Sequence, residues 1–191
     1  MKNSFLPCLR RGFRVSMRYD IAVIRGGIMG LAVGRELALR YPRHKIAIVE
    51  KEERIGTHQT GHNSGVIHSG LYYRPGSFKA RFCVAGAEAL KIYCQENEIP
   101  YEVCGKVVVA TSEEELGPLK TLYQRGMANG VEGLEMIGPE RLKELEPYAR
   151  GLRALLCPPT GIVDFSLVAE SYAREFQERG GEIVTGARVD G

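Results

Sequence analysis

A glycine-rich turn near the start of the sequence is the first feature with a chemical use. Residues 21–34 read IAVIRGGIMGLAVG, an apolar strand followed by glycines and the start of an apolar helix. A dinucleotide-binding βαβ unit begins in this way, and it needs the spacing G-x-G-x-x-G. Gly27 and Gly30 occupy the second and third glycine positions, whereas Arg25 stands in the first. The turn therefore predicts a nucleotide cradle with one altered position.

The chemistry of such a cradle is the binding of a pyrophosphate by backbone amides at the positive end of the first helix. Gly27 would permit the close approach of the ligand, and Gly30 would let the helix pack tightly on the strand. Arg25 brings a charge that suits a diphosphate, but its bulk competes for the same space. We expect Arg25 to lower the affinity for the nucleotide.

An acidic residue completes the nucleotide pattern. Glu50 ends a second apolar run, KIAIVE at residues 45–50, and follows Gly30 by 20 residues. An acid at this place accepts hydrogen bonds from the adenosine ribose hydroxyls, which favours FAD or NAD over NADP. The alternative is an ordinary turn between a strand and a helix.

A loop rich in histidine is the second chemical feature. Residues 58–70 read HQTGHNSGVIHSG and contain His58, His62 and His68. A metal site is disfavoured, because the intervening residues are glycine and small polar residues that offer no carboxylate or thiol partner. Small residues between hydroxyl and amide groups suit a backbone that lies against a flat ligand such as a flavin ring. For any single histidine, a structural hydrogen bond is the alternative reading.

The elements that would position these residues alternate between strands and helices. Asp20 to Ile24 reads as a strand buried on both faces, and Gly105 as a bend in a longer strand. Asp164 or Ser166 caps the last helix. The further expected elements are helices at 28–41, 77–97, 113–129, from 138 and up to 179, strands at 45–50, 101–110, 152–157 and from 182, and a loop at 53–75. The order is that of an α/β protein.

Composition and charge place the chain among ordinary globular proteins. It has 191 residues, of which 44% are hydrophobic and 26% charged, and no apolar run long enough to cross a bilayer, so we expect it to be soluble. The net charge of +3 divides into +5 for residues 1–18 and −2 for the rest. The basic segment reads as a disordered extension before a natural start at Met17, or else as a transit peptide. No nucleic-acid binding is predicted. The five cysteines have no metal spacing and suit buried thiols in a reducing cytoplasm.

A stretch around the histidine loop resembles a known family. Residues 50–86, EKEERIGTHQTGHNSGVIHSGLYYRPGSFKARFCVAG, resemble the FAD-dependent L-2-hydroxyglutarate oxidases and dehydrogenases, within the wider group similar to D-amino-acid oxidase and glycerol-3-phosphate dehydrogenase. The run TGHNSGVIHSGLYY is the most specific part, and the segments CGKVVVAT and GIVDFSLVAE also match. The resemblance covers residues 19–191.

The resemblance implies an α/β fold, a glutathione-reductase-like FAD-binding Rossmann domain with the start of an inserted α+β substrate domain. After the basic extension at residues 1–18, the FAD-binding domain would take residues 19–99 and resume, incomplete, at 163–191. Residues 100–162 would belong to the substrate domain. Members of the family are much longer, so we expect this chain to lack later strands and to be poorly stable alone, and its enzymatic activity stays open.

The resemblance also assigns roles to single residues. FAD would be held at its pyrophosphate by Gly26, Gly27, Ile28, Met29 and Gly30, at its ribose by Glu50 and Lys51, and along its ring by Thr60, Gly61, His62, Asn63, Ser64, Gly65, Val66 and Ile67. His68 is the candidate base, because a neutral imidazole titrates in a suitable range. Lys79, Arg81 and Lys106 are candidate clamps for the carboxylates of the substrate. No metal is expected.

The implied reaction is the oxidation of a 2-hydroxy acid, L-2-hydroxyglutarate first, to the 2-oxo acid by hydride transfer to the flavin, with oxygen or a quinone as the electron acceptor. One alternative is a truncated product that binds no flavin and has no activity of its own. Another is an FAD-dependent glycerol-3-phosphate or amine oxidase relative, or an NAD-binding module. The expected location is cytoplasmic, with peripheral association at the inner membrane as a second option.

Overall fold

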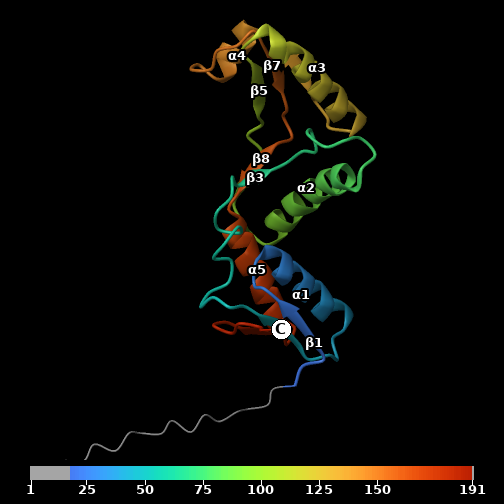
Figure 1. Ribbon diagram of the computed structural model, residues 1–191, viewed down its shortest axis with the longest axis vertical. Coiled ribbons are helices and arrows are strands. Elements are labelled where there is room, and N and C mark those ends of the chain that lie inside the picture. Colours follow the sequence, from blue (N-terminus) through green and yellow to red (C-terminus); the bar gives the residue numbers. More distant parts are fainter. Residues whose placement is uncertain (1–17, 191) are drawn as a thin grey trace, which may run out of the picture.

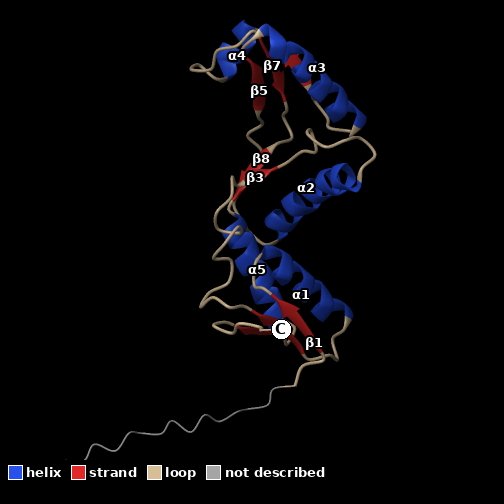
Figure 2. Cartoon of the chain, in the orientation of Figure 1, coloured by secondary structure: helices blue, strands red, loops and turns tan. Residues whose placement is uncertain are grey.

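The computed structural model describes residues 18–190 and shows an elongated molecule with its helices beside three small sheets (Figure 1). Helices and strands alternate along the chain, and long loops separate them in its first half (Figure 2). The expected α/β class is confirmed. The basic segment and Met17 lie outside the described residues.

A parallel three-stranded sheet forms one end of the molecule. Its strands have the order β1 (Ile21–Ile24), β2 (Ile46–Val49) and β9 (Glu182–Val184), and it packs against the helices α1 (Ile28–Arg40) and α5 (Phe165–Glu178). Leu31 of α1, Ile48 of β2 and Phe176 of α5 are fully buried in the core between these layers. The predicted strand, glycine turn, helix and second strand therefore form one βαβ unit.

The prediction that the first strand is buried on both faces is wrong. Ile21 and Val23 face the core with α1 and α5, whereas Ala22 and Ile24 point to the other side, where 59% of Ile24 is exposed. Strand β2 is the central strand of the sheet, between β1 and β9, and its residues Ile46, Ala47 and Ile48 are buried. An apolar pattern alone does not tell an edge strand from a central one.

A second small sheet joins distant parts of the sequence in the middle of the molecule. It is antiparallel in the order β3 (Val66–Ile67), β8 (Gly161–Val163) and β4 (Tyr101–Glu102), and α2 (Phe78–Glu96) lies beside it. The expected single strand over 101–110 was wrong, because Gly105 has φ +73° and divides it between two sheets. The predicted bend at this glycine is confirmed, whereas β8 was missed.

The third sheet forms the opposite end of the molecule. Its antiparallel strands have the order β5 (Val107–Ala110), β7 (Arg153–Leu156) and β6 (Glu135–Ile137), with the helices α3 (Glu113–Ala128) and α4 (Pro139–Leu145) beside them. The strand β6 was not predicted. The sheet has its own buried residues, including Ala154 and Leu155 of β7, so it is a separate core from that of the parallel sheet.

The helices start in different ways. The side chain of Ser77 caps α2, and that of Asp164 caps α5 by accepting a hydrogen bond from the Ser166 amide at 2.8 Å. Asp164 is therefore the cap, and Ser166 is not. Helices α3 and α4 carry acidic residues in their first turns. Among the described helices, only α1 has neither an acid in its first turn nor a capping side chain of its own N-cap residue.

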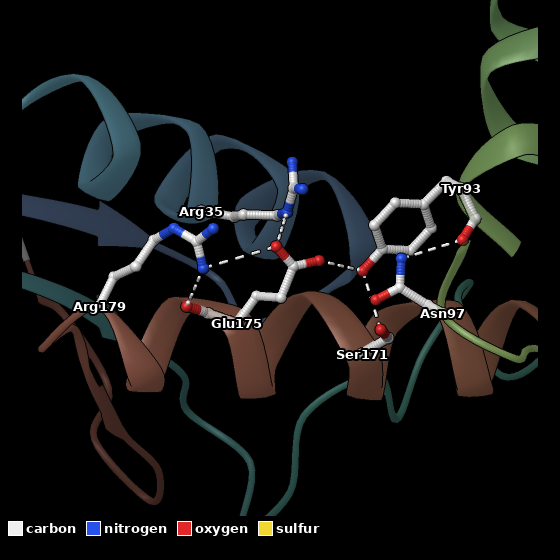
Figure 3. A network of polar contacts seen from close by, with 6 residues as sticks. All are labelled: Arg35, Tyr93, Asn97, Ser171, Glu175 and Arg179. Atoms are coloured by element: carbon white, nitrogen blue, oxygen red, sulfur yellow. Dashed lines mark hydrogen bonds and ion pairs between the residues drawn. The ribbon is translucent and has the colours of Figure 1, made fainter.

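A cluster of polar side chains joins three helices (Figure 3). Glu175 of α5 accepts hydrogen bonds from Arg35 of α1 at 2.9 Å and from the Tyr93 hydroxyl of α2 at 2.6 Å. The Tyr93 oxygen also lies 2.8 Å from Ser171 Oγ, and Arg179 reaches the Glu175 carboxylate at 3.5 Å. We call Arg35, Tyr93, Ser171 and Glu175 the three-helix clamp. It holds α1, the helix that follows the glycine turn, in place.

The cysteines follow the prediction only in part. Cys94 and Cys157 are buried, but Cys104 is exposed and Cys83 is half-buried. Cys8 lies outside the described residues. Within residues 18–190, no helix is long and apolar enough to cross a membrane.

Candidate functional site

Most of the predicted cofactor residues line one large cavity of about 1240 Å³. Small-ligand pockets usually measure about 300–1,000 Å³. The walls are the β1–α1 turn, the carboxyl end of β2, the histidine loop, parts of α2 and α5, and residues 187–189. Its size and its place at the carboxyl ends of parallel strands suit a dinucleotide.

The glycine turn has the tight geometry that its spacing predicts. A Cβ atom on Gly30 would lie 1.9 Å from the carbonyl oxygen of Arg25, so only glycine fits there. A Cβ atom on Gly27 would meet only Thr60 Oγ1, at 3.4 Å. Packing of the chain thus explains Gly30, whereas Gly27 leaves room for a ligand to approach the backbone.

Arg25 adopts a backbone conformation that favours glycine. Its φ angle is +88°, in the left-handed region, and its amide donates a hydrogen bond to Val49 O at 2.8 Å. A side chain in this region costs about 1–3 kcal/mol. The residue is exposed and lines the cavity, and its guanidinium has no ion-pair or hydrogen-bond partner among residues 18–190.

The first turn of α1 presents backbone amides to the cavity. Thr60 Oγ1 accepts a hydrogen bond from the Ile28 amide at 3.0 Å, and the first bond of the helix runs from Leu31 N to Gly27 O. The amides of Met29 and Gly30 come before that bond and have no acceptor in the described part of the chain. Open amides at a helix start form a binding site for an anion.

Glu50 lies at the end of β2 with its side chain turned toward the glycine turn. The carboxylate accepts hydrogen bonds from the Gly26 amide at 2.6 Å and from the Glu52 amide at 3.0 Å, and only 6% of the residue is exposed. Burial acts to raise the pKa of Glu50, but the amides of Glu52, Gly26 and Lys51 outweigh it and lower the pKa below its usual range. Glu50 is therefore an ionised acceptor, and each oxygen can accept a further bond.

The histidine loop is held in shape by Asn63. Its side-chain amide donates hydrogen bonds to Gln59 O at 3.1 Å and Thr60 O at 2.6 Å, while its oxygen accepts one from the Gly65 amide at 2.8 Å. Gly65 has φ +67° and leads into β3. The loop thus brings Thr60 to α1 and turns the chain along the cavity.

The three histidines of the loop lie in different surroundings. His58 Nε2 is 3.0 Å from Glu52 Oε1, and His62 Nδ1 is 3.0 Å from the His58 carbonyl oxygen. His62 lines a separate cavity of about 590 Å³, whereas His68 lines the large one. Residues 18–190 contain no group of three or more side chains placed to hold a metal ion.

His68 has an environment that keeps its imidazole neutral. Partial burial lowers its pKa, and the nearby positive charge of Lys106 lowers it further. A neutral imidazole at neutral pH has a nitrogen free to accept a proton. The side chain is accessible from the cavity.

Most of the predicted site residues meet at the cavity wall, and some do not. Gly26 does not line the cavity, and its amide donates a hydrogen bond to the Glu50 carboxylate. Ile67 is buried in the core beside α2 and α5. Gly61, His62 and Gly65 also lie off the wall. The predicted residues that line it are Gly27, Ile28, Met29, Gly30, Glu50, Lys51, Thr60, Asn63, Ser64, Val66 and His68.

Sequence reasoning missed part of the wall. Leu90 of α2 and Phe165 and Tyr172 of α5 line the cavity, and so do Ala187, Arg188 and Val189. The last segment is brought there by pairing of β9 with β2, after which the Ala187 amide donates to Glu50 O at 2.9 Å. The start of a strand at 182 was visible in the sequence, but its neighbour in the sheet was not.

Residues 20–191 match the protein family described as FAD dependent oxidoreductase. The chain belongs to this family. Among its relatives, L-2-hydroxyglutarate dehydrogenase of Homo sapiens is 53% identical over 173 residues, which are 91% of this chain and 37% of that protein. The L-2-hydroxyglutarate dehydrogenase of Indibacter alkaliphilus is 50% identical over 91% of this chain and 43% of its own length.

Solved structures of related oxidoreductases have the same fold. L-alpha-glycerophosphate oxidase from Mycoplasma pneumoniae, with FAD bound, matches with a TM-score of 0.82 at 28% identity, over 91% of this chain and 46% of that one. Glycine oxidase from Geobacillus kaustophilus matches with a TM-score of 0.80 at 26% identity, over 90% and 48%. The chain thus spans less than half of each of these relatives. The family resemblance, the incomplete fold class and FAD as the cofactor of the family are confirmed.

The residues of the cavity fit FAD. Open amides at the start of α1 and the free space at Gly27 suit a pyrophosphate, and the ionised Glu50 suits a ribose. The exposed apolar side chain of Met29 lies beside them on the wall. Arg25 is the one residue of the turn that departs from this fit.

Proposed function

We propose that this chain is the cofactor-holding portion of an oxidoreductase that converts L-2-hydroxyglutarate to the 2-oxo acid. The observation that carries the proposal is the cavity, in which the open amides of α1, the ionised Glu50 and the neutral His68 face one space. The substrate comes from the names of the human and Indibacter relatives. We propose that residues 19–99 and 163–191 bind the cofactor. Residues 100–162 would belong to the substrate domain.

The residues of the cavity divide into those that bind and one that moves a proton. The amides of Gly27, Met29 and Gly30 would bind the pyrophosphate, and Glu50, with Lys51 beside it, would bind the ribose. Of the loop at residues 60–67, the residues that line the cavity would lie along the ring: Thr60, Asn63, Ser64 and Val66. FAD supplies, when bound, the acceptor for the hydride that leaves C2 of the hydroxy acid. His68 takes the proton of the substrate hydroxyl on a nitrogen of its imidazole, so the C–H and O–H bonds break and a carbonyl forms.

Titration of the purified chain with FAD tests the proposal. We expect quenching of flavin fluorescence with a saturable curve, and flavin absorbance that denaturation releases. Glu50→Gln should weaken binding by roughly tenfold, because a charged hydrogen-bond acceptor contributes about 1.5–3 kcal/mol. Glu53→Gln is the matched control, since Glu53 lies on the same segment but does not line the cavity. Equal binding by the Glu50 and Glu53 variants would contradict the assigned role.

Arg25 favours a second candidate, a chain that binds no flavin and has no activity of its own. The residue places a long side chain at the cavity wall where the turn favours glycine. If the wild-type chain is colourless and Arg25→Gly binds FAD, Arg25 is the defect. If neither binds, the cofactor-holding function proposed for this chain is wrong.

The likeness to L-alpha-glycerophosphate oxidase supports a third candidate, an FAD-dependent glycerol-3-phosphate or amine oxidase relative. Anaerobic bleaching of the flavin in a longer version of the protein distinguishes the substrates. L-2-hydroxyglutarate should bleach it, whereas glycerol 3-phosphate and glycine should not. Reoxidation by oxygen or by a soluble quinone would then identify the electron acceptor.

The location and the partners complete the proposal. We infer a protein of the cytoplasm, with peripheral association at the inner membrane as the second option. Small molecules are its partners, and nucleic acid is not. Cell fractionation with and without high salt separates the two locations, because salt releases a protein held at a membrane surface by charge.

A further inference from the structure

Three cationic residues were candidates to bind the carboxylates of a substrate, and their surroundings differ. Lys79 and Arg81 lie on the exposed face of α2, where the Arg81 guanidinium lies 5.8 Å from the centre of the Phe78 ring. Lys106 is half-buried just before β5 and lies close enough to His68 for its charge to act on that imidazole. Geometry connects the two segments as well, because Ser69, the residue after His68, has its Oγ atom 3.1 Å from Cys157 Sγ, and Cys157 pairs with Lys106 through the backbone.

The side chain of Lys106 contacts a tyrosine and no acid. Its Nζ atom donates a hydrogen bond to the Tyr72 hydroxyl at 3.3 Å and lies 4.4 Å from the centre of the Tyr72 ring. No carboxylate within residues 18–190 lies within ion-pair distance of Lys106. An ammonium without an anion partner is available to form a charge-assisted hydrogen bond with an anion.

The backbone on both sides of this pair is held by hydrogen bonds. Lys106 exchanges two backbone bonds with Cys157, of 3.1 and 2.8 Å. Asn129, at the end of α3, donates from its side-chain amide to Gly70 O and to Tyr73 O, both at 2.9 Å, and so clamps the segment that carries Tyr72. The backbone that carries the pair is therefore held in place before any ligand binds, which lowers the entropy cost of binding.

The same segment fixes the position of His68 relative to the pair. The Cys83 thiol of α2 donates a hydrogen bond to His68 O at 3.1 Å. Burial raises the pKa of Cys83, so the thiol stays neutral, while the His68 pKa is lowered. The positive charge of Lys106 acts on the Cys83 thiol as well as on the His68 imidazole.

We propose that Lys106 and Tyr72 form a subsite that binds a carboxylate of the substrate next to His68. The Lys106 ammonium pairs with the carboxylate, and the Tyr72 hydroxyl, whose oxygen accepts from Lys106, keeps its proton free to donate to the same anion. This subsite deepens the proposed function, on which the identity of the acid rests. One ammonium and one hydroxyl suit a single carboxylate, and the five-carbon dicarboxylic acid comes from the proposed function.

Binding of glutarate to the complete 191-residue chain without FAD tests the subsite. We expect calorimetry to show weak, saturable binding that Lys106→Met weakens by roughly tenfold or more, because a charge-assisted hydrogen bond is lost. Tyr72→Phe keeps the ring under Lys106 and should weaken binding by a smaller factor. Lys79→Met is the matched control and should bind glutarate like the wild type.

A second readout separates a direct role from damage to the fold. Glutarate should raise the His68 pKa in NMR titrations, because the bound carboxylate offsets the charge of Lys106. The shift should vanish in Lys106→Met and remain in Lys106→Arg. If spectra show that the Lys106→Met variant is unfolded, glutarate binding by Tyr72→Phe and Lys106→Arg decides whether the subsite exists.

Three results would overturn the subsite: no glutarate binding by the wild type at millimolar concentration, equal binding by wild type and Lys106→Met, or tighter binding of inorganic phosphate than of glutarate. The proposed function fails separately. If FAD does not bind but glutarate binding depends on Lys106, the subsite stands and the function proposed for the cavity is wrong. If FAD binds and glutarate binding is independent of Lys106, the function proposed for the cavity stands and the subsite is wrong.

Discussion

The three-helix clamp and the wall of the cavity are both polar, yet their groups are used in opposite ways. In the clamp, both oxygens of the Glu175 carboxylate are occupied, by Arg35 and by Tyr93. In the cavity, the amides of Met29 and Gly30 are open, and the Arg25 side chain has no partner in the described part of the chain. Both regions depend on α1, which carries Arg35 on one side and begins at the cavity.

The difference shows how stability and binding are separated in this molecule. Polar groups that are paired with one another hold the helices together and have little left to offer a ligand. Polar groups that stay open at the start of α1 contribute little to the fold, but they can bind an anion. Substitutions in the clamp should therefore change stability alone, and substitutions in the cavity should change binding more than stability.

The largest expected effect comes from a glycine where both properties meet. Gly30→Ala should lower the free energy of unfolding by about 3 kcal/mol or more and abolish FAD binding, because the new Cβ would lie 1.9 Å from Arg25 O. Gly27→Ala should change stability by less than about 1 kcal/mol but still weaken FAD binding. Urea unfolding and FAD titration measure the two effects. Equal stabilities of the two variants would show that the turn can open at no cost.

The clamp should show a smaller effect, confined to stability. Glu175→Gln should lower the free energy of unfolding by about 2 kcal/mol, since hydrogen bonds from a charged and a phenolic donor are weakened. FAD affinity should stay as in the wild type. Glu178→Gln, on the exposed face of the same helix, is the control for a change of charge. A large loss of FAD affinity in Glu175→Gln would break the separation of the two regions.

The clamp also predicts how the free energy of unfolding decreases at acidic pH. Burial acts to raise the pKa of Glu175, but bonds from Tyr93 and Arg35 outweigh it and lower the pKa below 4.5, the value of a free glutamate. A lowered pKa stabilises the fold above pH 4.5, and this contribution is lost as the pH falls through the folded value. Urea midpoints measured from pH 7 to pH 3 should fall less steeply in Glu175→Gln than in the wild type.

Relief of backbone strain should have a more modest effect, in the opposite direction. Arg25→Gly should raise the free energy of unfolding by about 1 kcal/mol, because φ of +88° favours glycine, and it should also strengthen FAD binding. Glu98→Gly relieves φ of +54° at the end of α2 and should raise stability without changing FAD binding. Arg25→Ala removes the long side chain but keeps the backbone strain. It therefore separates the effect of side-chain size from the effect of the strained φ angle. Weaker FAD binding by both Arg25 variants would show that the arginine assists the ligand.

The smallest expected effect on stability is at His68. His68→Gln should change the free energy of unfolding at pH 7 by less than about 0.5 kcal/mol. Because the folded pKa is lowered from 6.5, the wild type should lose some stability as the pH falls below 6.5, where the unfolded chain binds a proton first. That loss should be absent in His68→Gln. A longer, active version of the protein should lose most of its oxidation rate with the same substitution.

Local patterns predicted most elements of the fold and much of the cavity wall. The glycine spacing, the acid at residue 50 and the helix caps depend on neighbours a few residues away, and the structure contains all of them. The misses are β8, β6, the division of residues 101–110 between two sheets and the exposed side of β1, and each depends on which strand lies next to it. Short strands have little local signal, because pairing with a distant strand stabilises them.

The sequence by itself determined that α1 would begin with glycines and that Glu50 would end the strand beside it, since turns and helix starts follow from short-range sterics. Only the tertiary structure decided that Arg25 would keep a glycine conformation, that residues 187–189 would complete the cavity, and that Lys106 would pair with Cys157 beside Ser69. These outcomes depend on strand pairing and burial between residues far apart in the chain. Such contacts are selected by the packing of the whole molecule and leave no periodic pattern along the sequence.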